Sequence, residues 1–414
     1  MTNQAKKNTE CRYCGSTDLT RFLSLGEQPP SNSFISPEQV ESEESYPLDV
    51  YFCQSCYLVQ LLDVVPAETI FDDYVYLSSS SKALKNHYAG LAEYITERFG
   101  LNTDDIVVDI GCNDGILLHG YQLPGLNRIG VEPSKVVEIV RESGLKVVNE
   151  FFSPETARHI VDVHGAAKVI TATNVFAHVD NIGNFVEGVQ LLLDNSGVFI
   201  IEAPHLIDMI DQILFDTIYH EHLCYLSLTP IIPFLARYNL EVFDVERVNF
   251  GASGPAIRVF VQKKPGMQNA SDSVESMLEQ ESKWGIGKID RYMGYAGKVE
   301  SIRSEVLGII NGLKKTNVQI GGYGAPAKGN TLLNYFNITT EQVGYIAETN
   351  ELKQGLLAPG SHIPIVSEEL FLERMPEYAL LLSWNYLDFF LEKSEYIQKG
   401  GRFIVPMPDP RIIP

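Results

Sequence analysis

The sequence predicts an α/β protein in which a small N-terminal module precedes two β/α domains. Short apolar runs such as IVVDIG, RIGVEP and GVFIIEAP alternate with helical stretches over residues 101–265. The same alternation returns over residues 318–414, in runs such as VQIGGYG and YALLLSW. Alternating strands and helices form mostly parallel sheets with helices on both faces. Residues 1–70, in contrast, are rich in loop-forming residues and contain two CxxC pairs.

The order of elements in the first β/α domain can also be predicted. From Lys82 onward the apolar residues recur at helical spacing, and the serine run before it suits a helix cap. The last two strand candidates, LEVFDVERV and AIRVFVQK, are separated only by VNFGASG. That segment is too short for a helical crossover, so we expect these strands to be antiparallel. Residues 266–317 are polar with helical periodicity and indicate a helical connector.

Length, composition and charge limit the functional classes. A chain of 414 residues is expected to form two or three domains. Its net charge of −21 argues against a nucleic-acid-binding surface, which needs clustered Lys and Arg. No apolar run reaches the roughly 18 residues of a membrane span, and the start, MTNQAKKNTECR, has no apolar signal core. We therefore expect a soluble cytoplasmic protein with neither a nucleic acid nor a membrane as partner.

The N-terminal cysteines predict a structural zinc site. Cys11 and Cys14 form one CxxC pair, and Cys53 and Cys56 form the other. In a cytosolic chain paired CxxC knuckles favour tetrahedral Zn²⁺ over disulfides, and the metal would stabilise a module with too few apolar residues for its own core. The spacer, residues 15–52, exceeds the usual gap of roughly 15–20 residues, and an inserted loop would explain it. Free thiols, a redox pair and a catalytic zinc fit less well.

The stretch IVVDIGCNDGILL at 106–118 predicts a nucleotide-binding turn. A strand ending at Asp109 leads through Gly111, Asn113 and Gly115 into a helix, and Glu132 ends the next strand. Glycines allow close backbone approach of a ligand, and a carboxylate on the second strand can accept both ribose hydroxyls. The D-x-G-x-x-x-G spacing suits S-adenosylmethionine better than NAD, although many methyltransferases have glycine at the position of Asn113. The alternative is a tight turn beside a surface glutamate.

Two polar residues follow the fourth strand, in TATNVFAHV. Asn174 lies near the carboxyl end of this strand, and His178 comes four residues later. Ligands of open α/β sheets bind outside the carboxyl ends of the strands, so both side chains could face a methyl donor and its acceptor. They could equally be strand caps.

The segment TIYHEHLCYLS places Tyr219, His220, Glu221 and His222 in a row. In an extended segment His220 and His222 would point the same way, whereas in a helical or irregular segment several could converge. The spacing is not HExxH, so a metal site would need further ligands. A catalytic site would use histidine as a general base near neutral pH, with tyrosine and glutamate positioning it or stabilising an enolate. A polar surface is the remaining alternative.

A second glycine-rich turn, VQIGGYGAPAKGN, opens the C-terminal domain. Gly322, Gly324 and Ala327 fit the dinucleotide fingerprint, Lys328 suits a phosphate, and Glu348 follows the next strand. This turn could hold NAD or the nucleotide part of a substrate.

Together these motifs resemble one family. Zinc knuckles, DIGCNDG, YHEH, GYGAPAKGN and APGSHIPIVS follow in the order of the nucleotide-sugar C-methyltransferases that methylate C-3 of dTDP-4-keto-deoxysugars. The resemblance covers nearly the whole chain. It implies three parts: a zinc-binding module (1–70), a class I, Rossmann-like S-adenosylmethionine-dependent methyltransferase domain (71–265), and a helical connector with a Rossmann-like nucleotide-sugar-binding domain that lacks NAD (266–414).

The resemblance also implies roles for individual residues. His222 would take the C-3 proton, which the C-4 keto group acidifies, and the enolate would attack the sulfonium methyl; Tyr219, Glu221 and His178 would lie beside it. The implied cofactor contacts are Tyr76, Asp109, Gly111, Asn113, Gly115, Glu132 and Asn174. The implied substrate contacts are Ser79, Ser80, Tyr323, Lys328, Asn330 and Glu348. The implied zinc ligands are Cys11, Cys14, Cys53 and Cys56.

Some positions and alternatives stay open at this stage. The family pattern leads us to expect Asp and Arg where this chain has Glu348 and Thr349, and a more aromatic segment where it has serines 78–81. An O- or N-methyltransferase of the same build would not need a carbon-acid base. An NAD-dependent oxidoreductase or a non-catalytic scaffold would bind no S-adenosylmethionine. The expected partner is a nucleotide sugar, and the chain would be a monomer or small homo-oligomer.

Overall fold

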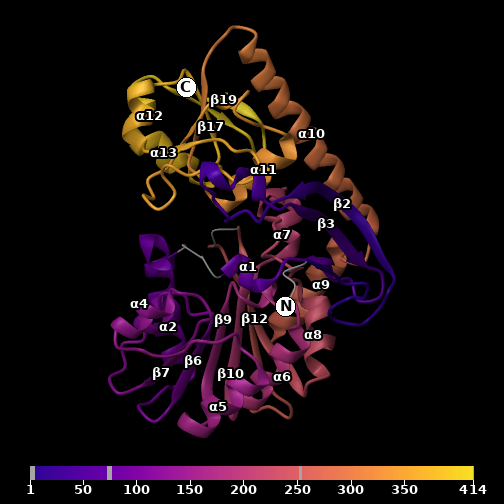
Figure 1. The fold of residues 1–414 in the computed structure, drawn as a ribbon. Helices are drawn as coiled ribbons and strands as arrows, with labels where there is room; N and C mark the ends of the chain where they lie inside the picture. The colour runs from indigo at the N-terminus through magenta and orange to yellow at the C-terminus, as the bar shows by residue number, and fades with distance from the viewer. Residues whose placement is uncertain (1–4, 72–76, 251–253, 414) are drawn as a thin grey trace.

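The computed structural model describes residues 5–71, 77–250 and 254–413. Within them the strands form sheets of seven, six and four strands and one two-stranded ladder. In Figure 1 the seven-stranded sheet lies at the bottom and the six-stranded sheet at the top. This arrangement confirms the predicted α/β class with two β/α domains.

The seven-stranded sheet has the order β12-β13-β10-β9-β6-β7-β8. Strand β13 is antiparallel to β12, as predicted, and also antiparallel to β10, which was not predicted; the other pairs are parallel. The strands are β6 (Ile106–Ile110), β7 (Asn127–Val131), β8 (Lys146–Val148), β9 (Ala167–Thr173), β10 (Leu193–Pro204), β12 (Leu240–Val248) and β13 (Ala256–Lys263). The strand order reverses between β6 and β9, and the loops after these two strands meet in the crevice where ligands of such sheets bind.

Helices and short 3₁₀ turns connect these strands. Ser81 caps the first helix by accepting a hydrogen bond from the amide of Leu84, as the serine run predicted. The elements are α2 (Lys82–Arg98), α3 (Ile116–Gly120), α4 (Val137–Glu142), α5 (Pro154–His164), η3 (Phe176–His178), α6 (Ile182–Leu192), α7 (Leu206–Asp211), η4 (Phe215–Thr217) and α8 (Leu228–Ala236).

The six-stranded sheet has the order β16-β15-β14-β17-β18-β19 and reverses between β14 and β17. Its first five strands in chain order were predicted, whereas the short antiparallel edge strand β19 was not. The elements are β14 (Ile320–Tyr323), α11 (Ala327–Phe336), β15 (Ile346–Ala347), β16 (Ile365–Val366), α12 (Glu368–Arg374), β17 (Tyr378–Leu381), η5 (Trp384–Tyr386), α13 (Leu387–Lys393), α14 (Glu395–Gln398), β18 (Arg402–Val405) and β19 (Arg411–Ile413).

The four-stranded sheet combines two distant parts of the chain, in the order β11-β4-β3-β2. Its strands are β2 (Leu19–Gln28), β3 (Tyr46–Cys53), β4 (Val59–Leu61) and β11 (Cys224–Tyr225). The other N-terminal elements are β1 (Lys6–Lys7), η1 (Pro37–Ser42), β5 (Asp63–Val64), α1 (Ala67–Phe71) and η2 (Ser78–Ser80). Strand β11 directly follows the YHEH segment, so its pairing with β4 attaches that segment to the N-terminal sheet.

Two connector helices, α9 (Asp272–Trp284) and α10 (Ile289–Lys314), join the β/α domains, as the periodicity predicted. Helix α10 runs along one side of the molecule beside β2 and β3 (Figure 1). One hydrophobic core contains Phe52 of β3, Ile207 of α7, Val299 of α10 and Leu333 of α11. The N-terminal sheet therefore shares its main hydrophobic core with the rest of the protein.

Candidate active site and zinc centre

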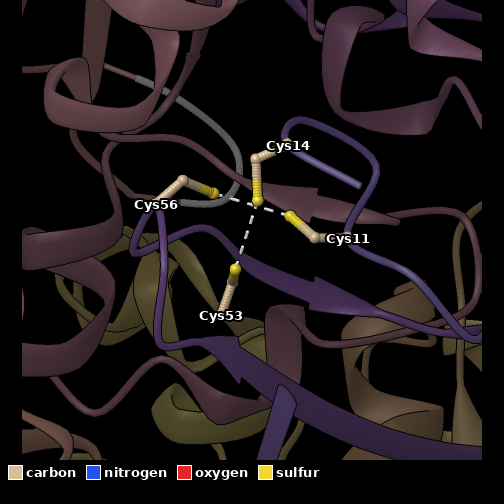
Figure 2. Close-up of side chains that lie close together, drawn as sticks. All are labelled: Cys11, Cys14, Cys53 and Cys56. Carbon is tan, nitrogen blue, oxygen red and sulfur yellow. Dashed lines mark hydrogen bonds between the residues drawn. The ribbon is translucent and has the colours of Figure 1, made fainter. Parts of the chain in front are cut away.

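The four N-terminal cysteines converge (Figure 2). Their sulfur atoms all lie within 4.8 Å of one another, with Cys11–Cys56 and Cys14–Cys53 separations of 3.5 and 3.6 Å. A tetrahedron with Zn–S bonds of ~2.3 Å has edges of roughly 3.8 Å, so this donor set fits Zn²⁺. The long spacer between the pairs is not simply an inserted loop, because it contains the whole of β2 and nearly all of β3.

The two knuckles have the same backbone form. In each, an amide donates 2.9 Å to the carbonyl of the first cysteine: Gly15 to Cys11, and Tyr57 to Cys53. Both donors are left-handed, with φ of 73° and 70°. Glycine adopts this conformation without strain, whereas Tyr57 adopts it at a cost.

Three residues of the glycine-rich turn after β6 have a left-handed backbone conformation, with positive φ. Gly111, Asn113 and Gly115 have φ of 66°, 50° and 78°. A Cβ at Gly111 would lie 2.5 Å from Cγ2 of Val175, so only glycine fits there. Asparagine is the non-glycine residue best suited to the left-handed region, which explains how Asn113 takes a position where glycine is common.

Glu132 at the end of β7 lies against this turn. Its Oε2 accepts from the amide of Asn113 at 2.9 Å, and its Oε1 accepts from the amide of Ser134 at 3.0 Å. Each carboxylate oxygen has a second lone pair, which remains available to a ribose hydroxyl. Asp109, in contrast, lies inside the sheet, where Thr171 Oγ1 donates to it at 2.6 Å, and burial raises its pKa to about 7. Its side chain thus links β6 to β9.

The serine segment lies over the same turn. The amide of Ser78 donates to Asn113 Oδ1, and the amide of Ser79 donates to Asp114 Oδ2, both at 2.9 Å. Ser80 closes η2. Tyr76 lies outside the described residues, so its predicted cofactor contact stays a prediction.

Asn174 lies on the opposite side of the crevice, directly after β9. It is left-handed (φ 55°), its amide donates to the carbonyl of Glu202 at 2.7 Å, and its Nδ2 donates to the Tyr88 hydroxyl at 3.4 Å. The structure therefore brings Asn174 to the same rim as Gly111 and Glu132.

The YHEH segment is a turn between η4 and β11, neither extended nor helical. The rings of Tyr219 and His178 flank His222, at centroid distances of 4.1 and 5.0 Å. The Nδ1–H of His222 donates to the carbonyl of Thr217 at 2.6 Å. A carbonyl can only accept, so this bond assigns the proton to Nδ1 and leaves Nε2 as an acceptor.

The side chains of His220 and Glu221 contact the N-terminal part of the chain, unlike that of His222. His220 Nε2 lies 3.3 Å from the carbonyl of Tyr46, and Glu221 Oε1 accepts from Asn32 Nδ2 at 2.7 Å. Burial raises the pKa of Glu221 to about 7. A hollow lined by His220, Glu221, His178 and residues 64–67 opens here, while His222, His178, Thr217 and Asn174 line another. His178 belongs to both.

Burial also lowers the pKa of the two facing histidines, to about 4 for His222 and about 3 for His178. Both rings are therefore neutral at pH 7, and neither places a positive charge beside the other.

The C-terminal residues separate into two groups. Lys328 lies at the strand-order reversal, where its Nζ donates to Asn385 Oδ1 at 2.5 Å and lies 4.6 Å from the Trp384 ring. Glu348 Oε2 accepts from the amide of Ala325 at 2.9 Å. This contact repeats the one between Glu132 and its own glycine-rich turn.

The other two predicted substrate residues lie deeper. Tyr323 packs among Phe371, Phe390, Tyr396 and Phe403 and bonds to Glu368. Asn330 is 1% exposed and donates to the carbonyl of Ser31 at 2.8 Å. The structure does not bring these two side chains to the Lys328 crevice.

Sequence reasoning missed a buried ionic group beside Asn174. Glu202 at the end of β10 is 3% exposed, with His87 Nε2 2.6 Å from Oε1 and Arg258 Nε 2.8 Å from Oε2. His87 also stacks on Phe250 at 4.5 Å. A glutamate ending the apolar run GVFIIE was the available signal, because a carboxylate at the carboxyl end of a buried strand faces the ligand crevice.

These features define the class of the protein: an enzyme that transfers a methyl group from S-adenosylmethionine, with a zinc centre. Models of three families match along the chain, a zinc binding domain at 11–71, a methyltransferase domain at 84–245 and a C-methyltransferase C-terminal domain at 251–408. The C-methyltransferase NovU of Streptomyces niveus is 32% identical over 98% of this chain and 96% of its own. The chain belongs to this family of C-methyltransferases.

Solved structures of methyltransferases resemble part of this chain more distantly. The mitomycin 7-O-methyltransferase MmcR is 18% identical over 45% of this chain and 55% of its own, with a TM-score of 0.35. Magnesium protoporphyrin IX methyltransferase ChlM from Synechocystis PCC 6803, solved with bound SAH, is 12% identical over 46% and 90%, with a TM-score of 0.34. Similarity at this level says nothing about the substrate. Among the described residues, no helix is both long and apolar enough to cross a membrane.

Proposed function

We propose that this C-methyltransferase methylates C-3 of a nucleotide-linked 4-keto-deoxysugar, with His222 as the general base. The observation that carries the proposal is the bond from His222 Nδ1–H to the Thr217 carbonyl, at 2.6 Å. It fixes the tautomer whose Nε2 can take a proton. A C-methyltransferase needs such a base, because carbon becomes a nucleophile only after a proton adjacent to a carbonyl is removed.

His222 Nε2 would remove the C-3 proton, and the electrons of the C–H bond would form an enolate with the C-4 oxygen. With a pKa of about 4 the imidazole is a weak base, so the imidazolium must be stabilised as it forms. The negative charges of the enolate and of a nucleotide diphosphate provide this stabilisation. The rings of Tyr219 and His178 pack against the His222 ring and limit its movement.

S-adenosylmethionine, held by the Gly111 turn, Glu132 and Asn174, supplies when bound an electrophilic methyl group for the enolate carbon. In the C-terminal domain, Lys328 lies at the sheet crevice and is half-buried. Burial lowers its pKa, and the charge of Asp216 opposes that shift. Its ammonium donates to the neutral Asn385 side chain, and no carboxylate is hydrogen-bonded to it among the described residues, which leaves room for an anionic ligand. We assign this crevice to the nucleotide diphosphate.

Exchange of the C-3 hydrogen tests the proposal. A dTDP-4-keto-6-deoxysugar in deuterium oxide with S-adenosylhomocysteine, followed by NMR, is expected to lose its C-3 proton signal with the native protein. His222→Ala is expected to lower the exchange rate by roughly 10²–10⁴-fold. His159→Ala, at an exposed histidine on α5, is the matched control and should exchange normally. Absence of exchange by native protein that binds the sugar would refute carbon-acid chemistry and favour O- or N-methylation.

A further inference from the structure

The segment that contains His222 is held from the C-terminal domain. We define the catalytic loop as residues 215–222. Trp384 Nε1 donates to Asp216 Oδ2 at 2.7 Å, and Thr331 Oγ1 of α11 donates to the carbonyl of Ile218 at 3.2 Å. The ring of Phe215 packs against Phe336 at 5.6 Å. The base therefore lies on a loop whose position depends on α11 and η5, the two elements that border the Lys328 crevice.

Asp216 is an unusual residue for such a loop. Its side chain is 0% exposed, and Oδ1 has no hydrogen-bond partner of normal geometry in the described part of the chain. Burial raises its pKa, and the charge of Lys328, the Trp384 indole and the backbone amides of Asp216 and Thr217 oppose that rise. A buried carboxyl with one bonded oxygen costs stability, so its presence here points to a role beyond packing.

Trp384 connects this carboxyl to the crevice. The indole N–H faces Asp216, while the Lys328 ammonium lies 4.6 Å from the centroid of the indole ring. An anion that binds Lys328 in the crevice therefore changes the electrostatic surroundings of the same indole that holds the catalytic loop.

Asp216 is linked to His222 through its neighbour in the chain, Thr217. Thr217 follows Asp216, and its carbonyl is the acceptor for His222 Nδ1–H. A shift of Asp216 moves this carbonyl and with it the direction of Nε2.

We propose that Asp216 and Trp384 are positioning residues, which orient His222 through Thr217 and couple its orientation to the anion site at Lys328. The coupling would favour substrates that carry a nucleotide diphosphate over free sugars. That specificity rests on the proposed function, whereas the positioning of His222 does not.

Trp384→Phe tests the coupling most directly, because it removes the N–H donor and keeps an aromatic ring under Lys328. A misplacement of ~1 Å at a catalytic group costs up to roughly 10²-fold in rate. We expect kcat for methyl transfer and the C-3 exchange rate to fall by about 10–100-fold, with KM for the nucleotide sugar and the Kd for S-adenosylhomocysteine changed less than about twofold. Asp216→Asn keeps an acceptor for the indole and should retain most of the rate.

The chain contains a matched control. Trp284 on α9 also donates its Nε1–H to an aspartate, Asp211 Oδ1, at 2.9 Å, but this aspartate ends α7 and is not part of the catalytic loop. Trp284→Phe should leave kcat unchanged. Equal losses in Trp284→Phe and Trp384→Phe, or no loss in Trp384→Phe, would overturn the proposal. A loss in Asp216→Asn as large as that in Trp384→Phe would also overturn it, because charge and not position would then matter.

A second measurement does not depend on the substrate. In protein labelled with nitrogen-15 histidine, the Nδ1–H proton of His222 gives a downfield NMR signal, assigned by its loss in His222→Ala. We expect this signal to shift or broaden in Trp384→Phe and to stay unchanged in Trp284→Phe. An unchanged signal in Trp384→Phe would refute the positioning role even if the sugar substrate is wrong, while lack of exchange by the native protein would refute only the proposed function.

Discussion

Replacement of Gly111 by alanine is expected to damage the site through Val175. The added Cβ would lie 2.5 Å from Val175 Cγ2, whereas carbon atoms in contact lie ~3.5–4.0 Å apart. Val175 must therefore move by about 1 Å to restore an ordinary contact distance. The residue before it is Asn174, and η3 with His178 begins directly after it. The movement of Val175 would therefore displace Asn174 and His178, across the crevice from the Gly111 turn.

The expected effect of Gly111→Ala has two parts, a loss of folding free energy and a loss of catalytic rate. At φ +66° alanine costs about 1–2 kcal/mol of folding free energy. The displacement of Val175 costs up to roughly 10²-fold in turnover. Gly144→Ala separates them, because Gly144 has φ +82° and open space at the Cβ position. Both variants should lose the stability that the positive φ costs, measured by urea unfolding, and Gly111→Ala should lose roughly 1–3 kcal/mol more through the contact with Val175. Only Gly111→Ala should lose activity.

Equilibrium dialysis with S-adenosylhomocysteine and a methyl-transfer assay provide the comparison. We expect Gly111→Ala to bind the ligand at least about tenfold more weakly than Gly144→Ala does. Equal affinity and equal kcat in the two variants would show that the crevice absorbs the extra methyl group, and the assignment of this turn to the cofactor would then be refuted.

Three further outcomes follow from the buried groups. Cys53→Ser should purify with less zinc and melt at a lower temperature, because the metal contributes folding free energy; metal content by emission spectrometry and thermal unfolding check this. Glu221, whose pKa burial raises to about 7, binds more protons folded than unfolded, so its contribution to stability is complete at acid pH and is lost as pH rises from about 4.5 through 7. Glu221→Gln keeps the Asn32 bond, so it should equal the native protein near pH 4 and exceed it at pH 8 by at most ~3 kcal/mol in urea unfolding. Arg258→Met leaves the carboxylate of Glu202 buried with His87 as its remaining side-chain partner among the described residues, so we expect a loss of about 3–5 kcal/mol, whereas a neutral result would show that Glu202 takes up a proton instead.

The central domain and the N-terminal sheet are joined at the catalytic loop. Strand β11, two residues beyond His222, pairs with β4, and Asn32 of the β2–β3 connection bonds to Glu221. Zinc binding at the ends of β3 and β4 therefore stabilises the same sheet that anchors the base.

The sequence alone determined the parts of this protein that depend on short-range patterns. The alternation of strands and helices, the glycine turn with Glu132 about 20 residues later, and the paired CxxC knuckles are local features, since each arises from spacing within one or two elements. They predicted the fold class and the family.

Only the tertiary structure decided which faces of the YHEH segment meet which partners. Periodicity could not place His222 toward His178 and Glu221 toward Asn32, because the segment is a turn without a repeat. It also could not show the bond between Trp384 and Asp216, which are 168 residues apart, or the placement of Tyr323 in a core and not in the crevice. Such contacts depend on how three separately predictable units pack together, and that packing leaves no local signature in the sequence.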